Sequence, residues 1–286
     1  MGLRINNNIA AQNAYRNLSV TDAQMGKSLE KLSSGYRINR AADDAAGLSI
    51  SEGLRSQIGG LKVAVRNAQD GISVVQTAEG ALTETHSILQ RMRDLSVQAA
   101  STGSQDSDAR DAAQTEFVQL GAELDRIATT TQFGGQKLLD TSSSPFIGTF
   151  QVGANTSAAD QIVVSLDNTA FGNITAVTGF DSTGLGVGSL DLVTGAASAI
   201  DAIDTAIKGV STARASLGAY QNRFEHTINN LNVAVENLSA SESRIRDTDM
   251  AQEMVSFTRS QILTQAGTSM LAQANQAPQN VLTLLR

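Results

Sequence analysis

Apolar side chains recur every three or four residues over a long stretch in the C-terminal part of the chain. The fourteen positions, eleven of them aliphatic or Phe, are Ile200, Ile203, Ile207, Val210, Arg214, Leu217, Gln221, Phe224, Ile228, Leu231, Val235, Leu238, Glu242 and Ile245. This spacing is typical of a coiled-coil helix. A helix of this length spans about 65 Å, so it cannot wrap around a compact core. It must lie along other helices.

A second long helix with the same rhythm is predicted in the N-terminal half. Its first stripe comprises Leu54, Ile58, Leu61, Val65, Ala68, Ile72, Val75, Glu79, Leu82, His86 and Leu89. Its second stripe comprises Val74, Ala78, Ala81, Thr85, Ile88, Met92, Leu95 and Ala99. Because the two stripes overlap, the C-terminal half of this helix is apolar on two sides. We expect it to pack between two neighbours.

A third helix is predicted by the spacing of Ala113, Phe117, Leu120, Leu124 and Ile127. The Gly, Ser and Asp residues from Ser101 to Ser107 predict a turn that ends one helix, followed by the N-cap of the next. Asp106, Asp108 and Asp111 resemble a calcium loop only loosely, because an EF-hand needs Gly where Asp111 stands. We interpret them as a charged first helical turn, which the helix dipole favours.

The composition favours helical rods and excludes several function classes. Aromatic residues make up 4% of the chain, Trp is absent, and there are two prolines in 286 residues, as expected where long helices leave few sites that tolerate Pro. The net charge of −7, without a basic stripe, argues against a nucleic-acid partner. No apolar run approaches the length of a membrane span, and residues 1–10 lack the apolar stretch of a cleaved secretory signal. The absence of Cys excludes disulfides and thiolate metal sites.

The middle of the chain has a different character. No Lys, Arg, His or Glu occurs between Lys137 and Lys208. Residues 146–152 alternate in polarity and residues 162–166 form a β-branched run, so we predict β-hairpins with loops around Gly153 and Gly172. We predict a loop over residues 178–190. For its glycine-rich run from Gly184 to Gly188 we expect a flexible loop rather than a phosphate-binding loop.

The two ends carry thin apolar faces. The N-terminal face consists of Leu3, Ile5, Ile9, Leu18, Met25, Leu29 and Leu32. The C-terminal face has Met250, Met254, Phe257, Gln261, Thr264, Thr268 and Leu271, followed by the apolar tail Val281, Leu282, Leu284 and Leu285. Neither face is large enough to stabilise a helix alone. We expect the two ends to pair, and to order fully only against further copies of the chain.

Ordered motifs at both ends resemble those of the bacterial flagellins. They are residues 31–39 (KLSSGYRIN), 42–48 (ADDAAGL), 90–98 (QRMRDLSVQ), 132–139 (QFGGQKLL), 241–251 (SESRIRDTDMA) and 271–276 (LAQANQ). The resemblance covers about residues 1–140 and 196–286. Because only a short segment separates the matched halves, this chain resembles a short flagellin without large outer domains.

The resemblance implies a mainly α fold of long antiparallel coiled-coil rods. Residues 1–44 and 240–286 would form an inner domain of paired terminal helices. Residues 45–239 would form an outer helical-bundle domain, with a β-hairpin and loop segment at about 141–195.

It also implies a structural, non-enzymatic subunit that self-assembles into the extracellular flagellar filament used for swimming motility. Such a subunit is exported through the flagellar type III apparatus and polymerised at the distal tip. Its expected partners are copies of itself, the export apparatus and its chaperone, the cap, and the hook-junction proteins, with no nucleic acid and no membrane insertion. The alternative is a hook–filament junction protein, which shares the terminal helices.

The resemblance assigns two sets of site residues. Self-assembly through the inner helices is expected at Leu3, Ile5, Ile9, Leu18, Met25, Leu29, Leu32, Met250, Met254, Phe257, Leu271, Leu282 and Leu285. Contact with neighbouring protofilaments, and with the vertebrate Toll-like receptor that senses flagellin, is expected at Leu89, Gln90, Arg91, Leu95 and Glu116.

No catalytic, cofactor or metal site is predicted. His86 lies in an apolar stripe and His226 on the long C-terminal helix, and they do not form a His-x-x-x-His pair, so we expect structural roles for both. Asn155 and Asn173 begin glycosylation sequons, which are common by chance. The Ser/Thr-rich segment 141–190 is a better candidate for O-linked sugars.

Overall fold

The computed structural model describes residues 8–101, 103, 106–140, 146–166 and 179–284, and for 277–284 it describes the backbone only. Its helices are α1 (Ile9–Ser34), α2 (Ala45–Ala100), α3 (Ser107–Thr130), α4 (Leu192–Arg246) and α5 (Met250–Leu284). Its strands are β1 (Gln132–Phe133), β2 (Gln136–Lys137), β3 (Ile147–Gln151) and β4 (Gln161–Ser165). The prediction of a mainly α fold of long helices with a small β-hairpin region is confirmed.

The chain divides into two compact units. The terminal unit comprises residues 1–58 and 236–286, and the central unit comprises residues 59–235. These divisions fall within α2 and α4, whereas the predicted domain boundaries lie at 44/45 and 239/240. The assignment of inner and outer domains to these segments stays a prediction.

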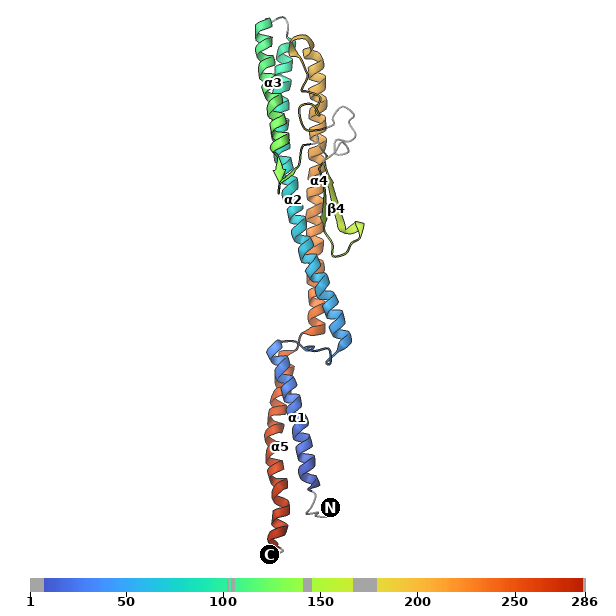
Figure 1. The fold of residues 1–286 in the computed structure, drawn as a ribbon, viewed down its shortest axis with the longest axis vertical. Helices are drawn as coiled ribbons and strands as arrows, with labels where there is room; N and C mark the ends of the chain where they lie inside the picture. The colour runs from blue at the N-terminus through green and yellow to red at the C-terminus, as the bar shows by residue number, and fades with distance from the viewer. Residues whose placement is uncertain (1–7, 102, 104–105, 141–145, 167–178, 285–286) are drawn as a thin grey trace. The chain divides into compact units, whose positions relative to one another are not determined.

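In the central unit, α2, α3 and α4 lie side by side (Figure 1). All fourteen predicted stripe positions of α4 are buried or half-buried, and Phe224 is fully buried. The helix begins at Leu192, earlier than the stripe, with a kink at Gly195. Side chains of α3 hold this start, because Gln114 accepts from the Leu192 N–H at 2.8 Å and donates to the Leu190 carbonyl oxygen at 3.1 Å.

One charged residue that interrupts the α4 stripe faces one that interrupts the α2 stripe. Arg214 Nη2 of α4 lies 3.7 Å from Glu79 Oε1 of α2, and both side chains are half-buried. A charged residue in each stripe is therefore matched by an opposite charge in the other. The pairing explains why both positions tolerate charge within an otherwise apolar contact.

Helix α2 packs on two sides, as predicted. Val74, Met92 and Leu95 from its second stripe are buried in one core with Phe117 and Leu124 of α3. The predicted N-cap is confirmed, since the Asp106 carboxylate accepts from the Ala109 N–H at 2.9 Å. Asp108 lies in the first turn of α3, as expected for a charged helix start.

Strands β3 and β4 form the predicted antiparallel hairpin, with Thr149 opposite Val163. Its loop contains Gly153 and a short 3-10 helix, Ala158–Asp160. The hairpin is fastened to the helices: the Asn67 side chain of α2 donates to the Gln151 carbonyl oxygen at 3.0 Å. The Phe150 ring packs edge-on against Phe224 of α4, with centroids 5.5 Å apart. The second predicted loop, at Gly172, lies outside the described residues.

A two-residue turn at Gly134 and Gly135 joins β1 to β2, a hairpin that the sequence analysis missed. Both glycines have positive φ, 58° and 84°, which is the backbone that a type I′ hairpin turn requires. The strands are two residues long, too short to produce an alternation that could be recognised.

The segment 179–190 is irregular, as predicted, but the expectation of a flexible loop is wrong. Phe180, Leu185 and Val187 are buried in the core of the central unit. Ser182 is held by Asp125 of α3, which accepts from its N–H at 2.7 Å and from its hydroxyl at 3.0 Å. The glycines of this segment permit close packing and do not make it a free surface loop.

In the terminal unit, α1 and α5 pair in antiparallel fashion (Figure 1). The α1 side of their seam consists of Ala11, Ala14, Leu18, Thr21, Met25, Ser28 and Leu32. The α5 side consists of Glu253, Phe257, Ser260, Thr264, Gly267, Leu271 and Ala274. Both sets follow the three-four spacing of a coiled coil. The backbones approach closely because the seam contains many small residues, and its two fully buried members are serines.

A compact junction joins the C-terminal end of α1 to the turn between α4 and α5. Gly35, with φ 75°, caps α1, and its carbonyl oxygen accepts from the Thr248 N–H at 3.0 Å. Arg246 bonds Glu52 at 2.7 Å and lies over the Tyr36 ring, 4.8 Å from its centroid. The junction therefore ties together segments from both ends of the chain.

Candidate assembly surfaces

Helix α5 carries large apolar side chains on the sides that α1 does not cover. At 100° per residue, Val255 and Ile262 lie opposite the seam, Leu263 and Met270 lie on one flank, and Met254 lies on the other. All five are exposed. A helix that is apolar on all sides is normally buried on all sides, so α5 lacks neighbours in the single chain.

The outward face of α5 is hollowed into a shallow apolar groove, which we call the α5 groove. It is lined by Met254, Val255, Thr258, Arg259, Ile262 and Leu263. Arg259 is its only charged group. The groove has the size and polarity to receive apolar side chains from another helix.

Helix α1 has exposed large side chains as well. Ile9, Tyr15, Val20 and Leu29 are more than half exposed. In the described part of the terminal unit, Ile38 and Ile58 are the only fully buried hydrophobic residues. The terminal unit therefore has almost no core of its own.

The predicted self-assembly residues fall into three groups. Leu18, Met25, Leu32, Phe257 and Leu271 are half-buried in the seam. Ile9, Leu29, Met250 and Met254 are exposed. Leu3, Ile5 and Leu285 lie outside the described residues, and Leu282 belongs to α5 but its side chain is not described.

Sequence reasoning missed six exposed residues of the same helices: Tyr15, Val20, Val255, Ile262, Leu263 and Met270. They lie outside the single stripe that the three-four spacing predicts on each helix. The signal that could have found them is the spread of apolar residues around the whole circumference of α5.

The predicted receptor and protofilament residues do not share one surface. Leu89 and Leu95 are buried in the core of the central unit, so their side chains offer no contact area. Gln90, Arg91 and Glu116 are exposed. Arg91 Nη2 and Glu116 Oε1 are 2.7 Å apart, joining α2 to α3. Only these three residues remain candidates for direct contact.

A second ion pair joins α2 to α4. Arg93 Nε lies 2.7 Å from Asp204 Oδ1. The hydrogen bond from Arg93 holds the pKa of Asp204 below its ordinary value and raises the pKa of Arg93. The pair therefore links α2 to α4 through a charge-assisted hydrogen bond.

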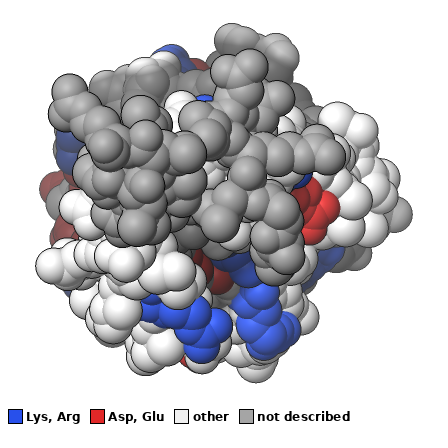
Figure 2. All heavy atoms as spheres, turned by 90° about the horizontal axis from the view of Figure 1, so that it is seen from below, with Lys and Arg blue, Asp and Glu red and all other residues white. Residues whose placement is uncertain are grey.

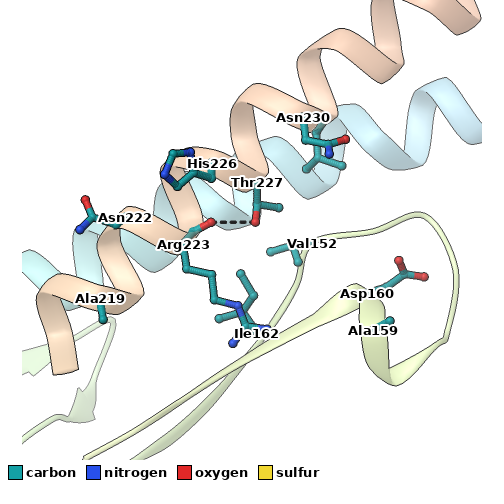
Figure 3. Close-up of a pocket in the computed structure, with 11 residues that line it drawn as sticks. Val152, Ala159, Asp160, Ile162, Ala219, Asn222, Arg223, His226, Thr227 and Asn230 are labelled. Carbon is teal, nitrogen blue, oxygen red and sulfur yellow. Dashed lines mark hydrogen bonds between the residues drawn. The ribbon is translucent and has the colours of Figure 1, made fainter.

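The central unit has an open groove of about 790 Å³ between α4 and the β3–β4 hairpin (Figure 3). Arg223 extends from α4 toward Ile162 of the hairpin, and Asp160 lies on the hairpin side. The hydrogen bond drawn there runs from the Thr227 hydroxyl to the Arg223 carbonyl oxygen, at 2.8 Å.

The predicted histidines have different environments. His86 is half-buried, with its Nε2 3.0 Å from the Gln90 amide nitrogen, and His226 is exposed at the central groove. Within the described ranges, no group of three or more His, Cys, Asp or Glu residues is arranged to hold a metal ion.

Charged groups do not form an extended patch on the face drawn in Figure 2. Its described atoms are mainly uncharged and white, with blue Lys and Arg atoms gathered in one part. No described helix combines the length and apolar character needed to cross a bilayer.

Comparison with known proteins identifies the family. The bacterial flagellin N-terminal helical region matches residues 5–144, and the bacterial flagellin C-terminal helical region matches residues 200–285. The chain is 54% identical to a flagellin of Halalkalibacterium halodurans over 282 residues, covering 99% of each chain. It is 51% identical to a flagellin of Bacillus subtilis over 307 residues, covering 99% of this chain and all of the other.

A crystal structure of Bacillus cereus flagellin is also similar, with 29% identity and a TM-score of 0.43, covering 58% of this chain and 88% of that one. The family matches cover most of the chain, and the relatives match it from end to end. The chain therefore belongs to the bacterial flagellin family.

Proposed function

We propose that this chain is the structural subunit of an extracellular flagellar filament, and that its copies join through the outward faces of α1 and α5. The observation that carries the proposal is the inverted arrangement of the terminal unit. Eight of the fourteen seam positions are Ala, Ser, Thr or Gly, while Ile9, Val20, Leu29 and five large apolar residues of α5 face outward. The full-length similarity to flagellins favours this function over that of a hook–filament junction protein.

The energetics favour burial of these faces by further copies. Covering the exposed half of a large aliphatic side chain contributes roughly 1 kcal/mol. Val255, Ile262 and Leu263 of α5, with Val20 and Leu29 of α1, together supply several such contributions per subunit. The polymer thus provides the core that the terminal unit lacks.

The contact is heterologous, because the outward sides of α5 differ from one another. One side presents the α5 groove, which extends as far as Leu263, and the flank beyond Leu263 presents Met270. Heterologous contacts that do not close produce helical polymers. We therefore expect an open helical filament rather than a closed dimer.

Membership of the family supports four further partners: the type III export apparatus with its chaperone, the filament cap, the hook-junction proteins, and a vertebrate Toll-like receptor. Export in an unfolded state is compatible with terminal helices that bury few residues, since little contact energy is lost on unfolding them. For the receptor, the candidate contacts narrow to Gln90, Arg91 and Glu116, which are exposed on α2 and α3.

The test is a pair of substitutions in the α5 groove. Ile262→Glu places a charge at the centre of the outward face, and it should raise the critical concentration for polymerisation by roughly tenfold or more, since a charge loses hydration on burial. Ile262→Leu keeps the face apolar and serves as the matched control. Light scattering and negative-stain electron microscopy measure the polymer, and circular dichroism checks that the central unit stays folded.

Normal filaments from the Glu variant, at the critical concentration of the unmodified protein, would show that α5 does not form the contact. Loss of polymer in both variants would indicate a requirement for Ile at this position rather than for an apolar surface. It would likewise contradict the proposal as stated.

A further inference from the structure

We propose that the exposed methionines of α5, Met250, Met254 and Met270, form an oxidant-sensitive site that controls whether a free subunit can polymerise. The inference rests on the proposed function, because it assigns a modification to the same outward face. An oxidant of the peroxide or hypohalous acid class would convert these thioethers to sulfoxides. A subunit modified in this way would be excluded from the filament.

The accessibility of the sulfur-containing residues carries the proposal. Met250, Met254 and Met270 are 48%, 50% and 65% exposed, whereas Met92 in the central core is 0% exposed. Met25 is half-buried in the seam between α1 and α5. The chain has no Cys, so a two-electron oxidant finds no thiol that would react first. The accessible sulfur of the described residues is therefore concentrated on the assembly helix.

The positions of the three methionines on α5 link their oxidation to assembly. Met254 lines the α5 groove beside Val255 and Ile262. Met270 lies seven residues after Leu263, on the same flank of the helix, and is exposed with it. Met250 begins α5. Met254 and Met270 are therefore parts of an apolar surface, and Met250 lies about one helical turn before Met254.

The chemical step is a transfer of one oxygen atom. With hydrogen peroxide, the thioether sulfur attacks one peroxide oxygen and the O–O bond breaks. The products are one sulfoxide and one water molecule. Sulfur loses two electrons and peroxide gains them, so no further reactant is needed.

The product opposes assembly because a sulfoxide is polar and chiral where the thioether is apolar and flexible. Its oxygen is a strong hydrogen-bond acceptor. In the lining of the α5 groove the side-chain donors are Arg259 and Thr258, and the Thr258 hydroxyl already donates to the Met254 carbonyl oxygen at 2.8 Å. Burying the oxygen without a donor costs free energy. In the filament the same sulfur atoms are covered by neighbouring subunits, so the sensitivity belongs to the free subunit.

The first measurement uses hydrogen peroxide on the monomer, followed by peptide mass spectrometry and a polymerisation assay. We expect sulfoxide at Met250, Met254 and Met270, with Met92 unmodified as the internal control. The critical concentration should then rise by roughly tenfold. Preformed filaments treated in the same way should gain little sulfoxide at the three positions.

Variants separate this effect from general damage. The triple variant Met250→Leu, Met254→Leu and Met270→Leu removes the three thioethers and keeps the surface apolar, so peroxide should leave its critical concentration at the value that the same variant has without oxidant. Met254→Gln, which introduces a polar side chain of similar length, should raise the critical concentration without any oxidant. Met25→Leu leaves the outward face unchanged, so it should remain as sensitive as the unmodified chain.

Two results would overturn the proposal. One is normal polymerisation of protein that carries full sulfoxide at all three positions. The other is equal inhibition of the triple Leu variant, because another residue would then be responsible. Either can occur while Ile262→Glu still blocks polymerisation, so a failure here is distinct from a failure of the proposed function.

Discussion

Single residues at helix contacts decide how closely the helices of this flagellin-family chain approach one another. The large Phe224 side chain is faced by a glycine, Gly71. A Cβ added at Gly71 would lie 2.7 Å from the Phe224 ring. Where charges interrupt a stripe, Arg214 faces Glu79. Both features look irregular in the sequence, and in the structure each is explained by the residue that faces it.

The Gly71 contact gives a prediction with an internal control. Gly71→Ala should destabilise the central unit by about 1–3 kcal/mol, because the new methyl group overlaps a ring that is fully buried. Gly80→Ala, in the same helix but with nothing within 4 Å of the added Cβ, should stabilise it by about 0.5–1 kcal/mol through helix propensity. Chemical denaturation followed by circular dichroism measures both. If the two variants shifted in the same direction, the Gly71 contact would not be close.

At the scale of elements, the two kinds of helix pairing in the chain use different side chains. In the central unit, Leu, Ile, Met and Phe fill the space between α2, α3 and α4. In the terminal unit, α1 and α5 meet through Ser, Ala, Thr and Gly with fewer large residues. Several large residues of α1 and α5, among them Val20, Val255 and Ile262, remain outside this seam, where a neighbouring subunit can contact them.

This difference predicts the effect of enlarging a seam residue. Ser260 is buried against α1, so Ser260→Leu should weaken the α1–α5 pairing by about 1–3 kcal/mol through overpacking. Ser269→Leu, at an exposed position of α5, is the control and should leave the pairing unchanged. Hydrogen exchange of α1 amides reports the pairing. Unchanged exchange in the Ser260 variant would mean that the seam has space for larger residues.

At the scale of the whole molecule, buried residues are distributed very unequally. The core cluster lies entirely within the central unit, while the terminal unit buries Ile38 and Ile58 among its described hydrophobic residues. Local stability follows buried apolar contact. The terminal unit is therefore the part of the chain that depends most on its neighbours.

We predict that hydrogen exchange will separate the two units in the free subunit. Amides of residues 59–235 should be protected, while those of α1 and α5 should exchange at least about a hundredfold faster, because helices with little buried area open readily. After polymerisation the terminal amides should become protected. Strong protection of α1 and α5 in the monomer would instead mean that their pairing is stable without assembly.

The amino-acid sequence by itself determined the long helices, the stripes of α2 and α4, the presence of an N-cap within residues 101–107 and the β3–β4 hairpin. These features depend on interactions between residues close in the chain, and periodicity reports them directly. The ordered motifs at both ends also indicate the family without any structural information. Short elements such as the Gly134–Gly135 hairpin were missed because two-residue strands have no period.

Only the tertiary structure decided which face meets which partner. Periodicity groups residues on one side of a helix, but it does not say whether that side contacts α1, another copy or solvent. The burial of Phe180 and Val187, the placement of Leu89 and Leu95 in the core, and the outward position of Ile262 all depend on residues distant in sequence. Helix packing in three dimensions sets these contacts, and it left α5 with apolar sides that a single chain does not cover.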